Sequence, residues 1–162
     1  MAEIYLAGGC FWGLEEYFSR INGVTATTVG YANGKTLDTN YQEVKDTDHA
    51  ETVHVTYDSS VVSLYDILRY YFRVIDPLSV NKQGNDVGRQ YRTGIYYTND
   101  ADLLVIDRIM SEQESLFGQK LAVEVEPLDN YVLAEEYHQD YLKKNPGGYC
   151  HINVDDAYKP LA

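Results

Sequence analysis

Cys10 is the residue whose type and setting most clearly favour chemistry. It lies in the stretch Gly8–Gly13, between a β-type run over residues 4–7 and a helical pattern formed by Leu14, Tyr17, Phe18 and Ile21. At such a helix start, unpaired N–H groups and the helix dipole stabilise a thiolate, so we predict a pKa for Cys10 below the roughly 8.5 of a free cysteine. Phe11 and Trp12 add an apolar wall beside the sulfur. The alternative is a small, inert core residue.

The four histidines do not favour acyl transfer, in which a cysteine nucleophile needs a histidine base and an orienting partner. His54 alternates with valines along a strand pattern and is interpreted as a solvent-facing spacer. His138 lies on a predicted helix face and is given a structural role. His49 is either a base or a cap of the strand that follows, and neither it nor His151 stands out.

Redox chemistry needs a reactive thiolate, a second thiol within reach and a proton donor. Cys150 follows the tether Pro146–Gly148 and can be the second thiol, although an inert C-terminal cysteine is the alternative. Glu51 opens a strand, and its carboxyl is either kept protonated by aromatic walls or is a solvated strand-end charge. Asp86 and Tyr91 are open to the same two interpretations. The residues alone therefore indicate a reactive-cysteine redox enzyme.

The composition is that of an acidic protein, and it lacks the basic residues of a nucleic-acid-binding surface. The 162 residues contain 13 Lys and Arg against 25 Asp and Glu, a net charge of −12, and no basic stripe. Two cysteines without a C-x-x-C pair exclude a zinc ribbon and a thioredoxin-type motif, and we expect no metal site. No apolar run approaches the roughly 18 residues of a membrane span, and no signal-peptide pattern precedes the first strand. We therefore expect a cytoplasmic protein with no nucleic-acid or membrane partner.

The elements that must position these residues alternate between strands and helices. Strands are predicted over residues 4–8, 24–31, 51–57, 94–98 and 121–125, and helices over 10–21, 64–75, 99–117 and 133–144. Long polar loops cover 35–50 and 78–93. This order predicts an α+β fold, a two-layer sandwich with a mixed β-sheet around a β-α-β-β-α-β (ferredoxin-like) core, with a long irregular C-terminal tail. A Rossmann fold is not expected, because no G-x-G-x-x-G opens a helix.

Spaced motifs along nearly the whole chain resemble the peptide methionine sulfoxide reductase A family. Gly9-Cys10-Phe11-Trp12-Gly13 matches the signature pentapeptide of that family. The other matching motifs, in order, are Gly30-Tyr31-Ala32, Tyr41-x-Glu43-Val44, His49-Ala50-Glu51, Gln83-Gly84-Asn85-Asp86, Gln90-Tyr91-Arg92, Glu136-Tyr137-His138-Gln139 and Gly148-Tyr149-Cys150. Enzymes of this class reduce one epimer of methionine sulfoxide.

The resemblance implies that Cys10 is the nucleophile that attacks the sulfoxide sulfur of the S epimer, in free methionine or in proteins. It implies that Phe11 and Trp12 hold the methyl group of the substrate. Glu51 would donate a proton to the sulfoxide oxygen. Methionine then leaves, and Cys10 becomes a sulfenic acid.

The resemblance also assigns roles to residues further along the chain. Tyr41 and Tyr91 match tyrosines that hydrogen-bond the sulfoxide oxygen, and Asp86 matches a residue that orders a water. Cys150 matches the resolving cysteine, which forms a disulfide with Cys10 that thioredoxin reduces. No cysteine follows Cys150, so we expect a two-cysteine relay.

We further expect no cofactor, a monomer, and one catalytic domain over residues 1–162. Because the family also occurs fused to a B-type reductase domain, we hypothesise that the chain is excised from such a fusion. Lys45 and Asp48 depart from the family, in which a cysteine and a glycine respectively occur. Two alternatives stay open: a thiol peroxidase that uses the same cysteine pair, and a non-catalytic domain that binds oxidised methionine.

Overall fold

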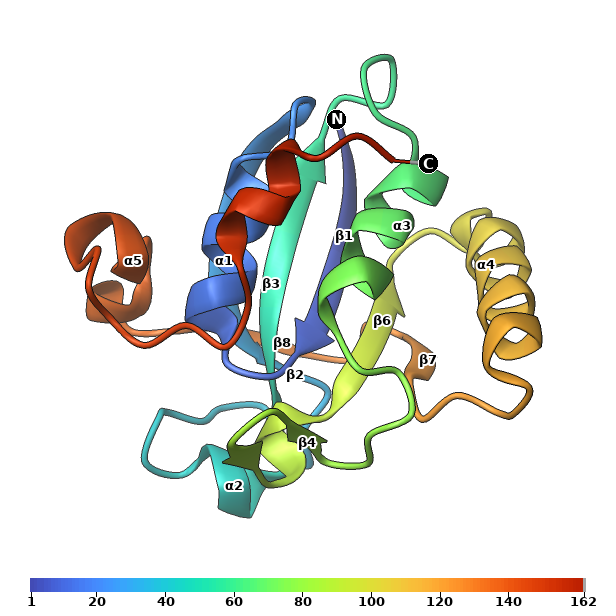
Figure 1. Cartoon of the computed structure of the whole chain (residues 1–162). Coiled ribbons are helices and arrows are strands. Elements are labelled where there is room, and N and C mark those ends of the chain that lie inside the picture. Colours follow the sequence, from blue (N-terminus) through green and yellow to red (C-terminus); the bar gives the residue numbers. More distant parts are fainter. Residues whose placement is uncertain (162) are drawn as a thin grey trace.

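The computed structural model describes residues 1–161, and its centre is a curled, six-stranded mixed sheet (Figure 1). The strands lie in the order β7-β6-β1-β3-β2-β8; β6 and β7 are parallel, and the other neighbours are antiparallel. Their bounds are β1 Ala2–Gly8, β2 Val24–Ala32, β3 Ala50–Tyr57, β6 Thr93–Tyr97, β7 Glu124–Pro127 and β8 Tyr131–Leu133. Two short strands, β4 Lys82–Gln83 and β5 Asp86–Val87, pair with each other.

The helices connect these strands and supply the second layer. They are α1 Phe11–Ser19, α2 Val44–Thr47, α3 Leu64–Val74, α4 Asp102–Phe117 and α5 Tyr141–Lys144, with 3-10 turns η1 Arg89–Tyr91, η2 Glu136–His138 and η3 Val154–Tyr158. Ser63 caps α3 by accepting a hydrogen bond from the N–H of Asp66. The mixed α+β class is therefore confirmed.

Side chains of β1 alternate between two clusters, so each face of the sheet has its own packing. Ile4 and Leu6 belong to the large core, to which α1 contributes Leu14 and Phe18 and α3 contributes Ile67. Both helices lie on this face of the sheet (Figure 1). On the other face, a smaller cluster is formed by Tyr5, Ala7, Ala32, Ala50 and Tyr96.

The helix predicted over residues 133–144 is wrong. Residues 131–133 form β8 on the edge of the sheet, and the helical pattern that follows is broken into η2 and the four-residue α5. Gln139 causes the break, because its side-chain amide bonds both the N–H and the C=O of Val29, as a neighbouring strand would. Asp140 then takes a left-handed backbone with φ 52°, which ends helical geometry.

Other boundaries also differ from the sequence-based prediction. The strand expected over 121–125 is β7 at 124–127, because the N–H groups of Leu121 and Ala122 bond Glu114 and Pro77 instead of the sheet. The polar loops contain the short elements α2, β4, β5 and η1. After α5, residues 145–153 form neither helix nor strand before η3. This segment runs back along α1 (Figure 1).

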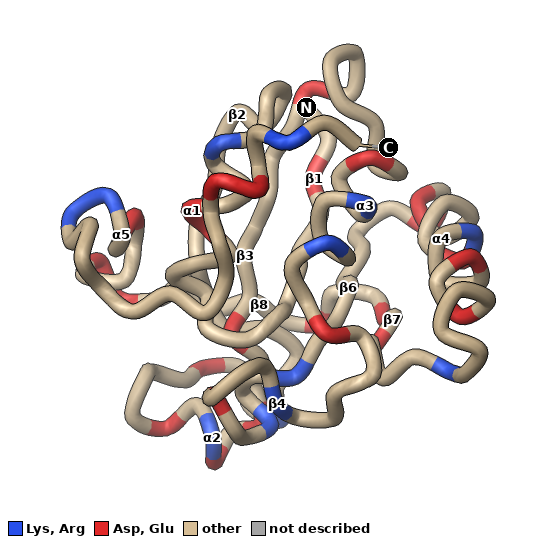
Figure 2. The backbone as a smooth tube through the Cα atoms, in the orientation of Figure 1, with Lys and Arg blue, Asp and Glu red and all other residues tan. Residues whose placement is uncertain are grey.

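Acidic residues are spread over many elements, and Lys and Arg are scattered through the fold (Figure 2). Within residues 1–161, no helix is both long enough and apolar enough to cross a membrane.

Candidate active site

Cys10 lies in the turn between β1 and α1, at the N-cap position of the helix. Gly9, directly before it, has φ +85°, a backbone conformation that favours glycine, and a Cβ there would come within 2.7 Å of Gln83. The side chain of Cys10 is buried but not sealed, with 7% of its residue surface exposed. The strand–turn–helix position predicted from the sequence is confirmed.

The predicted lowering of the Cys10 pKa is wrong. Burial raises the pKa of the thiol well above its ordinary value, and Glu51 and Asp86 raise it further. The N–H of Trp12 lowers the pKa, as a helix start should, but this effect is the smaller one. Dipole effects at helix ends are typically about 0.3–1 kcal/mol, whereas burial of a charge shifts a pKa by up to several units. Cys10 is therefore a thiol at neutral pH in this structure.

Glu51 lies beside Cys10 and is almost completely buried, with 2% exposed. It is near the start of β3, and its Oε1 accepts a hydrogen bond of 3.2 Å from the N–H of Phe11. Burial raises the pKa of Glu51 to about 8, the Phe11 N–H opposes this rise, and Asp86 adds to it. At neutral pH the carboxyl is therefore mostly protonated and can act as an acid, and the solvated-charge interpretation is excluded.

Aromatic rings form a wall next to Cys10. Phe11 is fully buried, with its ring centroid 5.6 Å from that of Tyr31 and 5.2 Å from that of His138. The ring of Trp12 stacks on that of Tyr141, with 3.8 Å between the ring centroids. Its indole N–H donates a hydrogen bond of 2.9 Å to Nδ1 of His138. These contacts fix the orientation of both rings. An apolar group such as a methyl would be well accommodated against them.

Tyr41, Tyr91 and Asp86 come together around the Cys10–Glu51 pair. Burial raises the pKa of both tyrosines, and Glu51 and Cys10 add to the rise in each case, so both phenols lie close to the pair. Asp86, on β5, raises the pKa of Cys10 and that of Glu51, so it too lies near the pair. The structure thus brings the two polar segments, 35–50 and 78–93, to one site.

The side chain of Cys150 packs against the first turn of α1. Its sulfur occupies the space above Gly13, where a Cβ would be only 2.7 Å from it. Both cysteines are free thiols. His151, the next residue, lies on the other side of the turn, with Nε2 3.2 Å from the C=O of Gly8.

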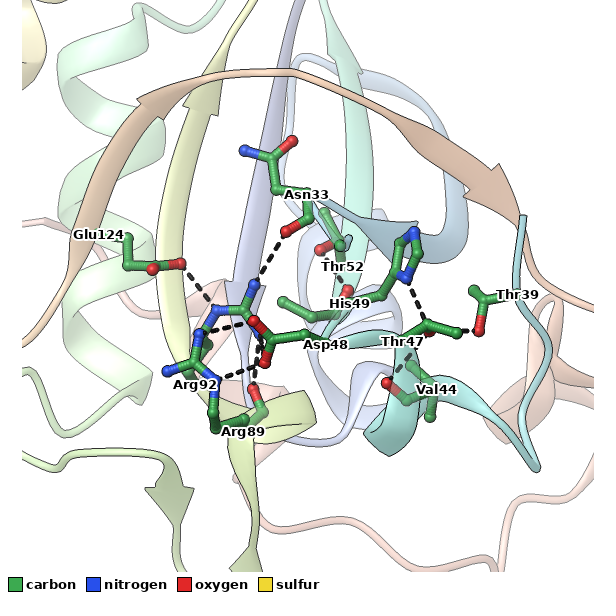
Figure 3. Close-up of polar contacts among 12 residues, drawn as sticks. Asn33, Thr39, Val44, Thr47, Asp48, His49, Thr52, Arg89, Arg92 and Glu124 are labelled. Carbon is green, nitrogen blue, oxygen red and sulfur yellow. Dashed lines mark hydrogen bonds and ion pairs between the residues drawn. The ribbon is translucent and has the colours of Figure 1, made fainter. Parts of the chain in front are cut away.

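A polar network centred on Arg92 fixes the turn η1, which ends at Tyr91 (Figure 3). Arg92, the next residue, is 5% exposed; its guanidinium donates to Glu124 Oε1 over 2.8 Å, to the C=O of Asn33 over 3.2 Å and to the C=O of Arg89 over 3.0 Å. It therefore ties η1 to the ends of β2 and β7. Five donors in a fixed planar fork suit arginine to this role.

The same network fixes the loop before Glu51. Asp48 has a left-handed backbone with φ 63°, which accounts for glycine being common there in the family, and its carboxylate pairs with Arg89. His49 is fully buried, and its Nδ1 lies 2.8 Å from the hydroxyl of Thr47 (Figure 3). These contacts favour the structural interpretation of His49.

Sequence reasoning missed three residues that complete the site. His138 is 1% exposed and contacts the rings of Phe11, Trp12 and Tyr41, so its role extends beyond the helix face expected for it. Tyr149 donates its hydroxyl to Asp86 over 2.9 Å, and His151 packs beside Gly9. His138 could have been inferred from Trp12, because the indole N–H of a half-buried tryptophan needs a hydrogen-bond acceptor.

No group of three or more His, Cys, Asp or Glu side chains within residues 1–161 is arranged to hold a metal ion. The chemistry available from the described residues is that of two thiols, one protonated carboxyl and several phenols. Together with the fold, they define the site of a thiol-dependent oxidoreductase.

The comparisons with known proteins identify the family. Residues 2–161 match the peptide methionine sulfoxide reductase family, and the chain belongs to it. The enzyme therefore reduces methionine sulfoxide to methionine, and neither the peroxidase nor the binding-domain alternative is favoured.

Solved structures agree with this assignment. Reduced Mxr1 from Saccharomyces cerevisiae is 40% identical, with a TM-score of 0.89 over 94% of this chain and 91% of that one. Methionine sulfoxide reductase A of Corynebacterium diphtheriae is 33% identical, with a TM-score of 0.80 over 91% of this chain and 76% of that one. Mxr1 in complex with Trx2 is 31% identical, with a TM-score of 0.63 over 86% and 84% of the two chains.

Proposed function

We propose that this enzyme reduces the S epimer of methionine sulfoxide, free or in proteins, with Cys10 as nucleophile and Glu51 as proton donor. The observation that carries the proposal is the hydrogen bond from the N–H of Phe11 to Glu51, which fixes a protonated carboxyl beside the sulfur of the preceding residue. An acid held next to a nucleophile is what a reaction with a departing oxygen requires.

In the proposed first step, the sulfur of Cys10 attacks the sulfoxide sulfur while Glu51 gives its proton to the sulfoxide oxygen. The thiol proton of Cys10 replaces the proton that Glu51 has given, and the oxygen ends on Cys10. One thiol and one sulfoxide thus yield one sulfenic acid and one thioether. The protons balance without an external donor, in keeping with two groups that are both protonated at neutral pH.

Substrate contacts follow from the walls of the site. Phe11 and Trp12 hold the S-methyl group, since their rings are fixed and apolar. The hydroxyls of Tyr41 and Tyr91 donate to the sulfoxide oxygen, and Asp86 orders a water beside it. The influence of Glu51 and Cys10 on the pKa of each phenol supports this assignment, because it places both hydroxyls near the reacting pair.

Cys150 resolves the sulfenic acid in this proposal, and thioredoxin reduces the resulting Cys10–Cys150 disulfide. Support comes from the sulfur of Cys150 lying above Gly13, one helical turn from Cys10. The complex of the related Mxr1 with Trx2 supports thioredoxin as the reductant.

We also propose that residues 1–162 work as one catalytic domain and as a monomer, in the cytoplasm, where thioredoxin and glutathione keep thiols reduced. For the fold we propose a ferredoxin-like core. The strand order β6-β1-β3-β2, with α1 and α3 as the two connecting helices, supports it.

The stoichiometry without reductant tests the proposed roles. Reduced enzyme mixed with excess methionine sulfoxide should form about one methionine per chain and lose both thiols. Cys150→Ser should form the same methionine and accumulate a sulfenic acid that a dimedone probe labels. Cys10→Ser should form none. Methionine formation by Cys10→Ser, or loss of only one thiol in the wild type, would contradict the proposal.

A further inference from the structure

The space above Gly13 is taken by the side chain of Cys150. A Cβ on Gly13 would lie 2.7 Å from the Cys150 sulfur and 3.3 Å from Cγ1 of Ile152. Both distances are shorter than the about 3.5–4.0 Å at which non-bonded carbon atoms pack favourably. Any residue larger than glycine at position 13 would therefore move the sulfur.

Gly13 and Cys10 share one face of the helix start. Cys10 is the N-cap of α1 and Gly13 its third residue, so they are three positions apart, and side chains at that spacing are neighbours on a helix surface. The sulfur of Cys150, lying above Gly13, is for this reason next to the position from which the Cys10 side chain projects.

The segment that carries Cys150 is held against α1 on both sides. Before it, Lys143 pairs with Glu16 on α1 over 2.7 Å; after it, Asp155 pairs with Arg20, the C-cap of α1, over 2.6 Å. Between α5 and η3, residues 145–153 have no helix or strand of their own. The pairs therefore hold this irregular segment against the helix that starts at Cys10.

A cavity of about 220 Å³ borders Cys150 on the side away from Cys10. It is lined by Glu16 and Arg20, which lie further along α1 than Gly13, and by Leu142 and Ile152. A sulfur displaced from Gly13 has room to move into this cavity, where its separation from Cys10 increases.

We propose that Gly13 is a positioning residue for the resolving step: its missing side chain lets the sulfur of Cys150 lie within reach of Cys10, and the Arg20–Asp155 pair holds it there. The inference rests on the proposed roles of Cys10 and Cys150. In the step, a Cys10–Cys150 S–S bond forms as the S–O bond of the sulfenic acid breaks. The thiol proton of Cys150 leaves with the hydroxyl as water, so the sulfenic sulfur is reduced and the Cys150 sulfur is oxidised.

The test separates the two steps in one single-turnover experiment on the full chain. Methionine formation is followed by chromatography and the Cys10–Cys150 disulfide by alkylation and mass spectrometry. Gly13→Ala should form methionine at the wild-type rate but form the disulfide roughly 10–100-fold more slowly, since a 1 Å misplacement of reacting groups costs up to about 100-fold. A dimedone probe should trap more sulfenic acid in this variant.

Three further variants complete the design. Gly147→Ala, at a glycine whose Cβ would meet nothing within 4 Å, should form the disulfide at the wild-type rate. In a Cys150→Ser background, Gly13→Ala should leave sulfenic acid formation unchanged. Arg20→Met leaves position 13 intact and should also slow the disulfide selectively, so it tests the placement if Gly13→Ala does not fold.

Disulfide formation at the wild-type rate in Gly13→Ala, or in Arg20→Met, would overturn the inference. Equal slowing of methionine and disulfide formation by Gly13→Ala would also overturn it, because the glycine would then act on the first step. Failure of the proposed function looks different, since the wild type itself would form no Cys10–Cys150 disulfide.

Discussion

The indole N–H of Trp12 donates a hydrogen bond of 2.9 Å to Nδ1 of His138, which joins the turn that carries Cys10 to a segment 126 residues away. The acceptor role of Nδ1 places the proton of the neutral imidazole on Nε2. Burial lowers the pKa of His138, so the ring is neutral at neutral pH. This bond, with the Tyr141 stack, holds the Trp12 ring in the site.

We predict that His138→Ala frees the Trp12 ring and raises KM by about 10-fold, the effect of losing roughly 1.4 kcal/mol of binding, with a smaller change in kcat. Trp12 is the only tryptophan, so the fluorescence comes from its ring alone and should shift to the red when the ring is freed. His54→Ala, which removes a partly buried histidine from the middle of β3, is the matched control and should leave both readouts unchanged. An unshifted emission maximum in His138→Ala would contradict the proposed role.

Replacement of Glu51 tests the acid directly. Glu51→Gln keeps an oxygen that can accept from the N–H of Phe11 but has no proton to donate. We expect methionine formation in a single turnover to fall by roughly 10²–10⁴, the typical contribution of a positioned acid, while binding and fold are kept. Rapid-quench measurement at neutral pH gives the rate. Unchanged turnover would remove Glu51 from the mechanism.

The pH dependence of the first step should follow the proton on Glu51. The pKa of this carboxyl is raised to about 8, so the acid form is present at lower pH and is lost above that value. We predict that the single-turnover rate falls up to about tenfold per pH unit above about pH 8, because only the protonated form donates. A rate that keeps rising at higher pH would instead indicate limitation by the Cys10 thiolate.

The raised pKa of Glu51 also makes the stability of the folded enzyme depend on pH. An unfolded glutamate has a pKa of about 4.3, so as pH rises the unfolded chain releases the proton while the folded enzyme keeps it. This contribution to stability is fully present below about pH 4 and is lost progressively up to about pH 8.

Glu51→Gln removes this loss, because glutamine does not titrate. Relative to the wild type, its Tm should therefore rise between about pH 4.5 and about pH 8. A pKa raised from about 4.3 to about 8 corresponds to roughly 5 kcal/mol, or on the order of 10 °C or more at roughly 2–4 °C for each kcal/mol in a domain of this size. Thermal scans by circular dichroism measure the difference. Glu126→Gln, at an exposed position on β7, is the control. A Tm difference that does not change with pH would contradict the buried acid.

The sequence was sufficient for the positions of Cys10 and the strand of Glu51, because local patterns determine both. A strand run, two glycines and a helical period locate the turn that carries Cys10, and alternation locates β3. It was not sufficient for the pKa of Cys10. That value depends on burial and on Glu51 and Asp86, which only the folded chain brings close to the thiol.

The C-terminal third was the least predictable part, since its structure depends on contacts far away in the sequence. Tyr137, Tyr141 and Leu142 have a helical spacing, but the side chain of Gln139 bonds the backbone of Val29 and interrupts it. The placement of Cys150 above Gly13 likewise depends on pairs between α1 and the tail, and no local pattern encodes them.

Epimer-resolved consumption of a racemic methionine sulfoxide peptide, with dithiothreitol as reductant, tests the central claim most directly. The account predicts that wild-type enzyme removes the S epimer alone and that Cys10→Ser removes neither. Consumption of the R epimer, or of neither epimer by the wild type, would contradict it.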